Sequence, residues 1–303
     1  MARANGSSWL FGATSVIGYA LVRQGPPEQI PFAPPFNRAA RKLHWPALDV
    51  ADTDALRGLL DNRTPPSTLV YAHAVCTVKK CEANPDWAWR MNVTPIEWLV
   101  KHLPGTTRLV YISSDHVFGN DGTYDEHDVP RPISCYARTR LEAERRVLSR
   151  PNSLVVRPGL AIGPSIDGRT GHYDWLAYRS RKELPISIVE DEARSAVWAD
   201  DLATRLWALI RSEREGVMHQ PATQTVSRVE LAQQLMAHHK LPAVFNRETR
   251  AQQPHPHLGQ VTLASGLRDP LTTPLPSVVD RLPADVTGMD GLTGVCTVRS
   301  SDG

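Results

Sequence analysis

Long apolar runs are missing from this sequence of 303 residues. The longest, such as residues 69–75, are far shorter than the ~20 residues that span a bilayer, and the start MARANGSS lacks the apolar segment of a signal peptide. Blocks of one charge are also missing, because 34 basic and 32 acidic residues are interspersed and leave a formal charge of +2. These absences argue against a membrane or a nucleic-acid partner and predict a cytoplasmic protein.

Cysteine is scarce, and the chain has four of these residues: Cys76, Cys81, Cys135 and Cys296. They form neither a CxxC pair nor the spacing of a zinc site. We therefore expect free thiols in a reducing compartment, no disulfide and no metal site.

Short strand-like segments alternate with helical patterns through the first half of the chain. Strand patterns cover residues 8–11, 68–75, 108–113 and 153–158, and helical spacing covers residues 87–102 and 136–148. This alternation predicts an α/β fold, a doubly wound parallel sheet of the Rossmann type covered on both faces. Five prolines in residues 24–36 predict a short second strand with an irregular connection.

A glycine-containing turn, LFGATSVIGYAL, follows the first strand and opens a helix. Gly12 and Gly18 stand where a dinucleotide-binding loop has its first and third glycines, and Ser15 takes the middle position. A serine crowds the place where phosphates approach, although its hydroxyl can donate to a phosphate and the helix N-terminus still offers free amides. The pattern favours a dinucleotide site over a plain turn, with further loop residues Thr14, Val16 and Ile17.

The acidic residue that accepts the ribose hydroxyls of NAD, about twenty positions after such a loop, is absent. The corresponding segment, PFNRAARK at residues 35–42, carries three cations instead. Arg38 and Arg41 can make charge-assisted hydrogen bonds to a 2′-phosphate, which favours NADP. A solvated basic turn is the alternative, and NAD stays an alternative cofactor.

Several motifs in a fixed order resemble one family. The segment VYISSDHVFGNDGTYDEHDVPRPISCYARTRLEAE is similar to the active-site segment of dTDP-4-dehydrorhamnose reductases, in the extended short-chain dehydrogenase/reductase superfamily. GATSVIG, LDVAD, VCTVKKCEANPDWAWRMNV and VWADDLA extend the resemblance over most of residues 8–282. It implies the same Rossmann fold, a nicotinamide cofactor and a smaller lobe that holds the substrate.

The resemblance implies three catalytic positions. Ser114 takes the place of the hydroxyl residue that binds the substrate carbonyl, and Tyr136 takes the place of the acid that protonates it. Arg140 stands where the family has a lysine that binds the nicotinamide ribose and lowers the pKa of the tyrosine. Because residues four apart share a helical face, Arg140 reaches the same region, but a guanidinium cannot relay a proton as an amine does.

Other matched positions complete the expected site. Asp49 and Val50 correspond to residues that hold the adenine ring, and residues 72–74 (Ala72, His73, Ala74) correspond to a run beside the nicotinamide. His116 replaces a family tyrosine. For both His73 and His116 two roles stay open, that of a new acid/base group and that of a structural residue. The positions expected to contact the substrate are Ser114, Asp115, His116 and Tyr136. We expect Asp115 to hold its loop in place by accepting hydrogen bonds, and Asn92 to support the active-site face.

The second half of the chain is less regular. Residues 194–210 end in an amphipathic helix, and residues 227–239 begin with a serine N-cap. We assign residues 1–158 and 195–210 to the dinucleotide-binding domain, residues 159–194 and 211–282 to the substrate lobe, and residues 283–303 to a flexible tail.

Three functions fit these residues. The first is an NADP(H)-dependent reductase of a carbonyl on a sugar nucleotide or similar polar metabolite, and the second is a binding or regulatory protein without turnover on the same scaffold. The third is a redox-neutral enzyme, a dehydratase, epimerase or condensing enzyme, that uses Tyr136 or His116 as its base. Residues 168–182 hold cations and aromatics that either grip a nucleotide diphosphate or cover an ordinary helix. The resemblance also makes a homodimer plausible.

Overall fold

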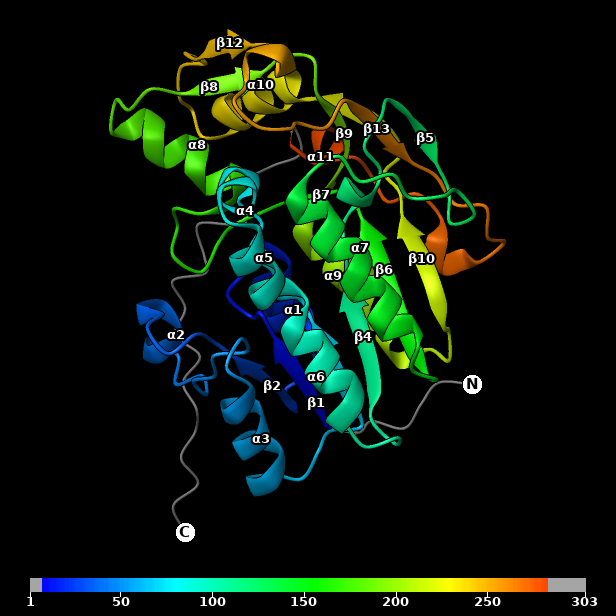
Figure 1. Ribbon diagram of the computed structural model, residues 1–303. Coiled ribbons are helices and arrows are strands. Elements are labelled where there is room, and N and C mark those ends of the chain that lie inside the picture. Colours follow the sequence, from blue (N-terminus) through cyan, green and yellow to red (C-terminus); the bar gives the residue numbers. More distant parts are fainter. Residues whose placement is uncertain (1–6, 283–303) are drawn as a thin grey trace.

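A six-stranded parallel sheet forms the centre of the molecule in the computed structural model, which describes residues 7–282 (Figure 1). Its order is β10-β6-β4-β3-β1-β2. The strands are β1 (Ser8–Phe11), β2 (Gln29–Phe32), β3 (Thr68–Tyr71), β4 (Arg108–Ile112), β6 (Ser153–Pro158) and β10 (Gly216–Gln220). This confirms the predicted doubly wound α/β fold.

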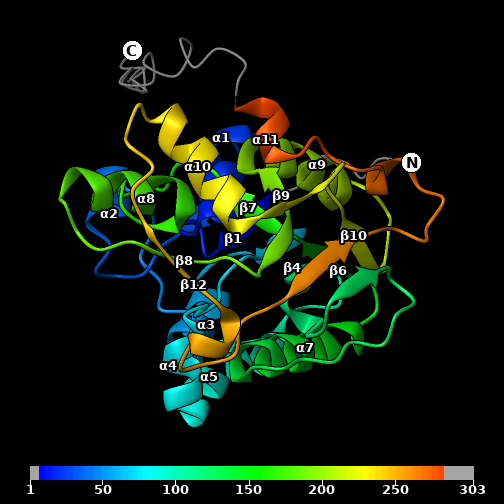
Figure 2. The ribbon, with the colours of Figure 1, turned by 90° about the horizontal axis from the view of Figure 1, so that it is seen from above.

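Side chains that alternate along each strand supply a core on both faces of the sheet. Leu10 packs with helices α1 (Val16–Gln24) and α9 (Ala199–Arg211), whereas Trp9 and Phe11 face the other core. That second core includes residues of α3 (Thr53–Asn62), α6 (Thr94–His102) and α7 (Cys135–Leu148). Figure 2 shows the two helical layers on opposite sides of the strands.

The sheet ends at β2, which is as short as the prolines predicted. Pro31 lies inside it, opposite Leu10 of β1. The chain then forms the short helix α2 (Arg38–Lys42) and returns to β3 with only an isolated bridge between Ala33 and Ala47. No further strand is added on this side within the described residues.

Two sequence predictions differ from the structure in their boundaries. The strand predicted over residues 68–75 ends at Tyr71, and residues 72–77 form an extended loop that leads to α4 (Val78–Ala83). The helix predicted over residues 87–102 is two helices, α5 (Pro85–Asn92) and α6. The break lies at Val93 because Pro95 lacks the amide hydrogen that would continue the first helix.

A smaller lobe sits above the carboxyl ends of the strands (Figure 1). It contains the sheet β11-β9-β13-β5 with β7 paired to β9, and the pair β12-β8. The strands are β5 (Gly122–Tyr124), β7 (Leu160–Ile162), β8 (Ser187–Val189), β9 (Ala193–Trp198), β11 (Thr225–Ser227), β12 (Asn246–Glu248) and β13 (Gln260–Leu263). The helices are α8 (Gly171–Arg181), α10 (Arg228–His238) and α11 (Val278–Arg281).

The chain passes between sheet and lobe more often than the proposed division allows for. β10 joins the parallel sheet although residues 211–282 are assigned to the lobe, and residues 195–198 of β9, which are assigned to the dinucleotide-binding domain, pair with β11 and β7 of the lobe. The predicted helices after residues 194 and 227 are present as α9 and α10, and Ser227 caps α10 by accepting from the Glu230 amide at 3.1 Å.

The thiols of Cys76, Cys81 and Cys135 are free, whereas Cys296 and the proposed tail lie outside the described residues. Within residues 7–282 no helix is long and apolar enough to cross a membrane, and no group of three or more His, Cys, Asp or Glu residues is placed to hold a metal ion.

Candidate active site

The glycine turn lies where the strand order reverses, between β1 and β3. Gly12 has φ +85°, and a Cβ there would lie 2.4 Å from the His73 amide nitrogen. A Cβ on Gly18 would lie 2.1 Å from the Gly12 carbonyl oxygen. Both glycines are therefore required by the close approach of backbone at this point, which is where open α/β sheets bind ligands.

The Ser15 side chain makes hydrogen bonds within the glycine turn. Its hydroxyl donates to the Gly12 carbonyl at 2.9 Å and accepts from the Gly18 amide at 3.0 Å, so it is the N-cap of α1. The hydroxyl is thus engaged within the loop, and a hydrogen bond from it to a phosphate remains a prediction. Thr14, Val16 and Ile17 lie in the same turn and at the start of α1.

The segment after β3 runs beside this turn. The Ala72 amide donates to the Phe11 carbonyl at 2.8 Å. The His73 Nε2 atom is buried and has no hydrogen-bond partner among residues 7–282. Burial and the nearby Arg140 cation lower the pKa of His73 to about 4. His73 is therefore neutral near pH 7, with one polar atom left for a ligand.

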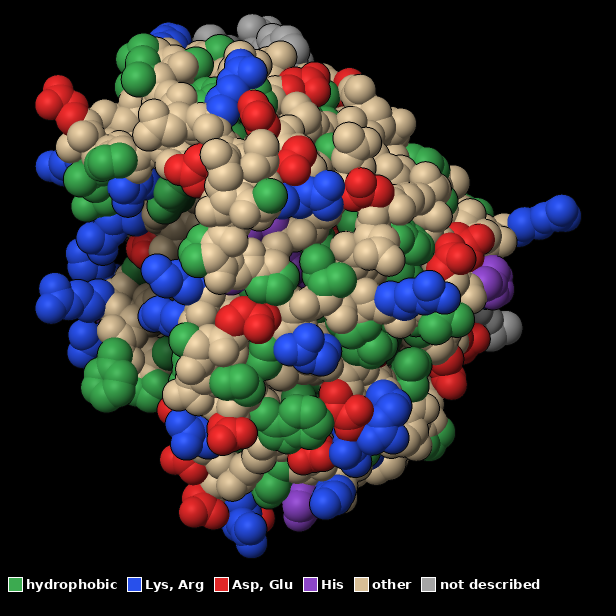
Figure 3. Space-filling model, turned by 45° about the horizontal axis from the view of Figure 1, so that its top comes forward, with side chains coloured by type: hydrophobic (Ala, Val, Ile, Leu, Met, Phe, Trp, Pro, Cys, Tyr) green, Lys and Arg blue, Asp and Glu red, His purple; other side chains and the backbone are tan. Residues whose placement is uncertain are grey.

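A basic cavity lies at one side of the sheet. A cavity of about 900 Å³ opens beside α2 and is lined by Arg38, Lys42, Arg169, Tyr19 and others. Figure 3 shows Lys and Arg side chains gathered on the left of the molecule, the side on which α2 and α8 lie. Arg41 is not among the lining residues, and Val50 is buried in the core. Asp49 accepts from the Ala51 amide at 3.0 Å and so shapes the neighbouring turn.

Ser114 and Tyr136 converge on His116. The Ser114 hydroxyl accepts from the His116 amide at 3.3 Å and caps a short 3-10 helix (Asp115–Val117) after β4. Tyr136, in the first turn of α7, packs its ring edge-on against the His116 ring at 5.2 Å between centroids. Ser114 thus contacts the backbone of His116, and Tyr136 contacts its ring, at the carboxyl edge of the sheet.

Burial governs the acidity of Tyr136, which is 6% exposed. Burial raises the pKa of the phenol to about 12 although the Arg140 cation lowers it. Tyr136 is therefore fully protonated near neutrality, as a proton donor must be.

Arg140 turns toward the sheet. Its guanidinium donates to the carbonyl oxygens of Ile112 and, at 3.4 Å, His73, and it lies 4.5 Å above the Tyr111 ring. No carboxylate of residues 7–282 pairs with it. The charge stays within electrostatic range of Tyr136, but the donors are already directed at backbone carbonyls. This direction could not be foreseen from the spacing of the two residues.

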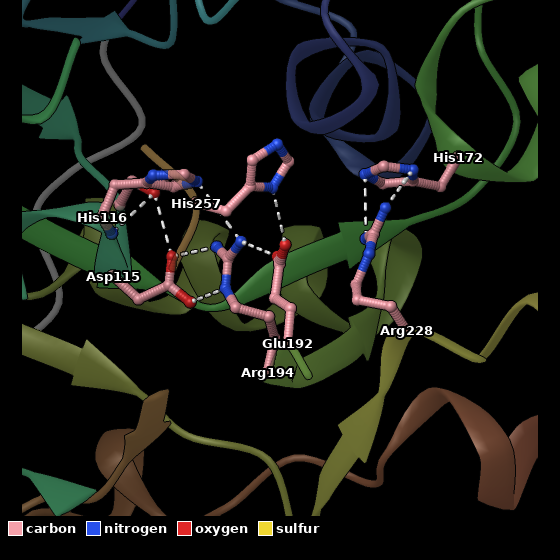
Figure 4. Close-up of polar contacts among 8 residues, drawn as sticks. Asp115, His116, His172, Glu192, Arg194, Arg228 and His257 are labelled. Carbon is pink, nitrogen blue, oxygen red and sulfur yellow. Dashed lines mark hydrogen bonds and ion pairs between the residues drawn. The ribbon is translucent and has the colours of Figure 1, made fainter. Parts of the chain in front are cut away.

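A buried set of charges, which we call the Asp115 cluster, connects the loop after β4 with the lobe (Figure 4). It comprises Ser114, Asp115, His116, Glu192, Arg194 and His257. Arg194 of β9 binds both carboxylate oxygens of Asp115, at 2.6 Å for Nε to Oδ2. Its Nη1 atom lies 3.3 Å from His116 Nε2 and 3.4 Å from Glu192.

His116 is held neutral by this cluster. Burial and the Arg194 cation lower the pKa of His116 to about 4, and its Nε2 atom accepts from Arg194. The loop-fixing role expected for Asp115 fits its complete burial, whereas an acid role for His116 does not fit a ring that is neutral near pH 7. As a base, its acceptor nitrogen is occupied.

A second buried set, the Glu144 cluster, has nearly the same composition. The Ser113 hydroxyl donates to Glu144. Arg157 of β6 binds both Glu144 oxygens, and its Nη2 atom lies 2.6 Å from Glu144 Oε2. His219 completes it, with Nε2 3.4 Å from Arg157 Nη1 and Nδ1 3.0 Å from the Ala264 carbonyl.

The substrate lobe holds a cavity of about 560 Å³ between α8 and β8. Its lining includes Thr77, His172, Trp175, Glu192, Arg228, His255 and His257. Arg228 reaches His172 with contacts of 3.1 and 3.0 Å, yet one neutral imidazole offers a single acceptor nitrogen. Arg228 is therefore a cation with an unused donor at the wall of the cavity, which suits an anionic ligand.

Sequence reasoning found part of this cavity and missed the rest. His172 and Trp175 belong to residues 168–182, the segment expected either to grip a nucleotide diphosphate or to cover an ordinary helix, and both line the cavity. Glu192, Arg194 and Arg228 were missed. Glu192 and Arg194 stand five and three residues before the matched segment VWADDLA, and no local pattern marks Arg228.

Asn92 has the supporting role that the sequence predicted. Its side chain accepts from the Val75 amide at 2.8 Å and donates to the Thr139 hydroxyl at 3.0 Å. It thereby ties the loop after β3 to α7, which carries Tyr136.

Comparison with known families decides the relationship. The family model described as the RmlD substrate binding domain matches residues 8–258, which is most of the chain. The chain belongs to this family. The resemblance to dTDP-4-dehydrorhamnose reductases of the extended short-chain superfamily is thereby confirmed.

Individual relatives cover less of the RmlD-type chain. A methionine adenosyltransferase 2 subunit beta of Danio rerio is 32% identical over 130 residues, which are 42% of this chain and 39% of the relative. A dTDP-4-dehydrorhamnose reductase of Mycolicibacterium smegmatis is 28% identical over 193 residues, 61% of this chain and 57% of the relative. The chain thus spans about two- to three-fifths of these relatives.

The fold agrees over a longer stretch. The crystal structure of a dTDP-4-dehydrorhamnose reductase from Bacillus anthracis, in complex with NADP, superimposes with a TM-score of 0.77 at 20% identity. The match covers 92% of this chain and 98% of that one. At this identity the likeness establishes the fold alone.

Proposed function

We propose that this protein is an NADP(H)-dependent reductase of a carbonyl group on a sugar nucleotide. The observation that carries the proposal is that Ser114 and Tyr136 both contact His116 at the carboxyl edge of the sheet. A protonated phenol and a second hydroxyl, placed where an open α/β sheet binds ligands, suit carbonyl reduction.

The residues present fit a dinucleotide. Gly12 and Gly18 allow the tight turn after β1 that a dinucleotide-binding loop needs, and the His73 Nε2 atom beside it is buried without a partner among the described residues. Arg38 and Lys42 line the basic cavity at the adenosine end, where they would pair with a 2′-phosphate. When bound, the nicotinamide would supply the hydride. NADP is also the ligand of the similar Bacillus anthracis reductase.

The chain's own residues then handle the proton. Ser114 donates a hydrogen bond to the substrate carbonyl oxygen, and Tyr136 transfers its phenolic proton to that oxygen as negative charge develops there. Arg140 lies near enough to stabilise the tyrosinate that remains. Arg140 does not release a proton, so the phenol is reprotonated from solvent rather than through this side chain.

The substrate class follows from the lobe. Its cavity of about 560 Å³ offers Arg228 for a phosphate and Trp175 for a flat ring, which suits a nucleoside diphosphate joined to a sugar. The names of the reductase relatives agree with this class. Among such compounds dTDP-4-dehydrorhamnose is the first probe to use.

Cofactor and turnover are tested in sequence. NADPH is expected to bind with higher affinity than NADH in a nicotinamide fluorescence titration, and Arg38→Ala is expected to reduce that preference about tenfold. Oxidation of NADPH at 340 nm with dTDP-4-dehydrorhamnose then tests the reaction. Absence of binding of both NADPH and NADH at millimolar concentration would eliminate a reductase of any substrate, whereas binding without turnover would exclude this probe.

A regulatory subunit is the second candidate. The donors of Arg140 are engaged with the Ile112 and His73 carbonyls, an arrangement that a scaffold without turnover tolerates. Several relatives are named as the beta subunit of methionine adenosyltransferase 2. NADPH binding without oxidation by sugar nucleotides, combined with association with a methionine adenosyltransferase in gel filtration, would favour this function.

A further inference from the structure

We propose that Arg194 is a positioning residue for the Ser114 hydroxyl and that it connects this hydroxyl with the substrate-lobe cavity. The inference rests on the proposed function, since it concerns the reaction at Ser114 and Tyr136. It assigns a role to a residue of β9 that touches none of the reacting atoms.

The first step concerns the single proton of Ser114. A carboxylate can only accept, so the contact of 3.0 Å between Ser114 Oγ and Asp115 Oδ1 uses the hydroxyl proton. While it does so, Ser114 cannot donate to a substrate carbonyl. The hydroxyl must therefore turn away from Asp115 for catalysis.

The second step is that Arg194 permits this turn. Asp115 is fully buried, and loss of the donors that it has among the described residues would leave an unpaired charge in the interior. Because Arg194 donates to both carboxylate oxygens, the Ser114 hydroxyl is an extra donor that Asp115 can lose. Without Arg194, Asp115 would hold the Ser114 proton as its principal donor.

The third step connects Arg194 with the cavity. Glu192 lines the cavity and faces two cationic or donor groups, Arg194 Nη1 at 3.4 Å and His257 Nδ1 at 3.2 Å (Figure 4). A ligand that engages His257 changes how strongly Glu192 holds Nη1. Since the guanidinium is a rigid plane, a shift of Nη1 also moves the two donors that face Asp115.

The turnover experiment compares Arg194→Met with two other variants, using NADPH and dTDP-4-dehydrorhamnose. We expect kcat of Arg194→Met to fall about 100-fold while the KM for NADPH changes less than about threefold. Asp115→Asn in the Arg194→Met background removes the unpaired charge and is expected to recover at least about tenfold of kcat. This double variant also covers the case in which Arg194→Met alone does not fold.

The matched control is Arg157→Met, which removes the arginine of the Glu144 cluster. The side chains of Arg157 and Arg194 are both 5% exposed, and each binds a carboxylate that accepts from a serine. We expect kcat of folded Arg157→Met to stay within about threefold of the wild type. A kcat of Arg194→Met within threefold of the wild type, or no recovery in the double variant, would overturn the proposal.

Binding separates this proposal from the proposed function. If the wild-type protein does not reduce the probe, the proposed function fails for that substrate, and calorimetric titration with dTDP alone still tests the connection. Asp115 does not line the cavity. Asp115→Asn should therefore change the dTDP affinity at least about fivefold only if the Asp115 cluster couples Asp115 to the cavity. Equal affinities, or no dTDP binding to the wild type, would refute it.

Discussion

Two adjacent serines, Ser113 and Ser114, belong to clusters that are built alike and end differently. Each donates to a buried carboxylate that an arginine binds through both oxygens, and each arginine also faces a histidine Nε2 atom. In the Glu144 cluster the histidine donates to a backbone carbonyl, which closes the set. In the Asp115 cluster the arginine continues to Glu192 at the wall of a cavity.

The difference teaches where to look for function among buried ion pairs. Buried pairs cost desolvation and are weak indicators of stability, so their composition alone says little. What distinguishes the two clusters is the last partner, a main-chain carbonyl in one and an acid open to a ligand in the other. The Glu144 cluster fastens β6 to α7, whereas the Asp115 cluster joins a catalytic loop to the lobe.

The largest expected effect is that of Tyr136→Phe, which touches the Asp115 cluster through the His116 ring. Removing the proton donor should lower kcat for NADPH oxidation by about 10²- to 10⁴-fold while NADPH binding changes little. Steady-state kinetics and a fluorescence titration check both parts. A phenylalanine variant with full activity would show that another group protonates the carbonyl.

Arg157→Met tests whether the Glu144 cluster is purely structural. It leaves Glu144 buried without its cation, so the free energy of unfolding should fall by about 3–5 kcal/mol. Urea unfolding followed by tryptophan fluorescence measures this. The surface control Arg281→Met, which removes a pair with Asp201, should cost less than about 1 kcal/mol.

Acid should weaken the fold through the neutral histidines. The pKa of His116 is lowered to about 4 in the folded protein from about 6.5 when unfolded, so its contribution is present above pH 6.5 and is lost as the pH falls toward 4. His116→Asn should therefore flatten the decline of unfolding free energy between pH 6.5 and 4 by about 1–2 kcal/mol. Urea unfolding at several pH values checks it, and identical slopes would contradict the assignment.

The smallest effect is expected for Arg140→Lys. An ammonium restores a group that can exchange a proton and releases the Ile112 and His73 carbonyls from the guanidinium. We expect kcat to stay equal or to rise by up to about tenfold. A large loss would instead show that the guanidinium contacts themselves hold the active loop.

Local patterns predicted the parts of the fold that depend on local sequence. The alternation of strands and helices predicted the parallel sheet, and the glycines predicted the turn after β1. Ser227 predicted the start of α10. The break between α5 and α6 is indicated in the sequence by Pro95, but helical spacing alone does not show it. Pairing of β5 with β13 was beyond reach, because it joins segments more than 130 residues apart.

The candidate site divides in the same way. Ser114, Tyr136 and Arg140 stand in one continuous motif, so their presence could be predicted, but the direction of Arg140 depends on how its helix packs on β3 and β4. Arg194 and Asp115 are 79 positions apart and meet only after the lobe folds over the sheet. Neither the periodicity nor the composition of the sequence predicts a contact between residues so far apart in the chain.

Pro31 in the edge strand β2 has a consequence for behaviour in concentrated solution. An unprotected edge offers a row of amides and carbonyls onto which a strand of another molecule can add. A pyrrolidine ring interrupts that row, so edge-to-edge growth into fibrils is disfavoured on this side of the sheet.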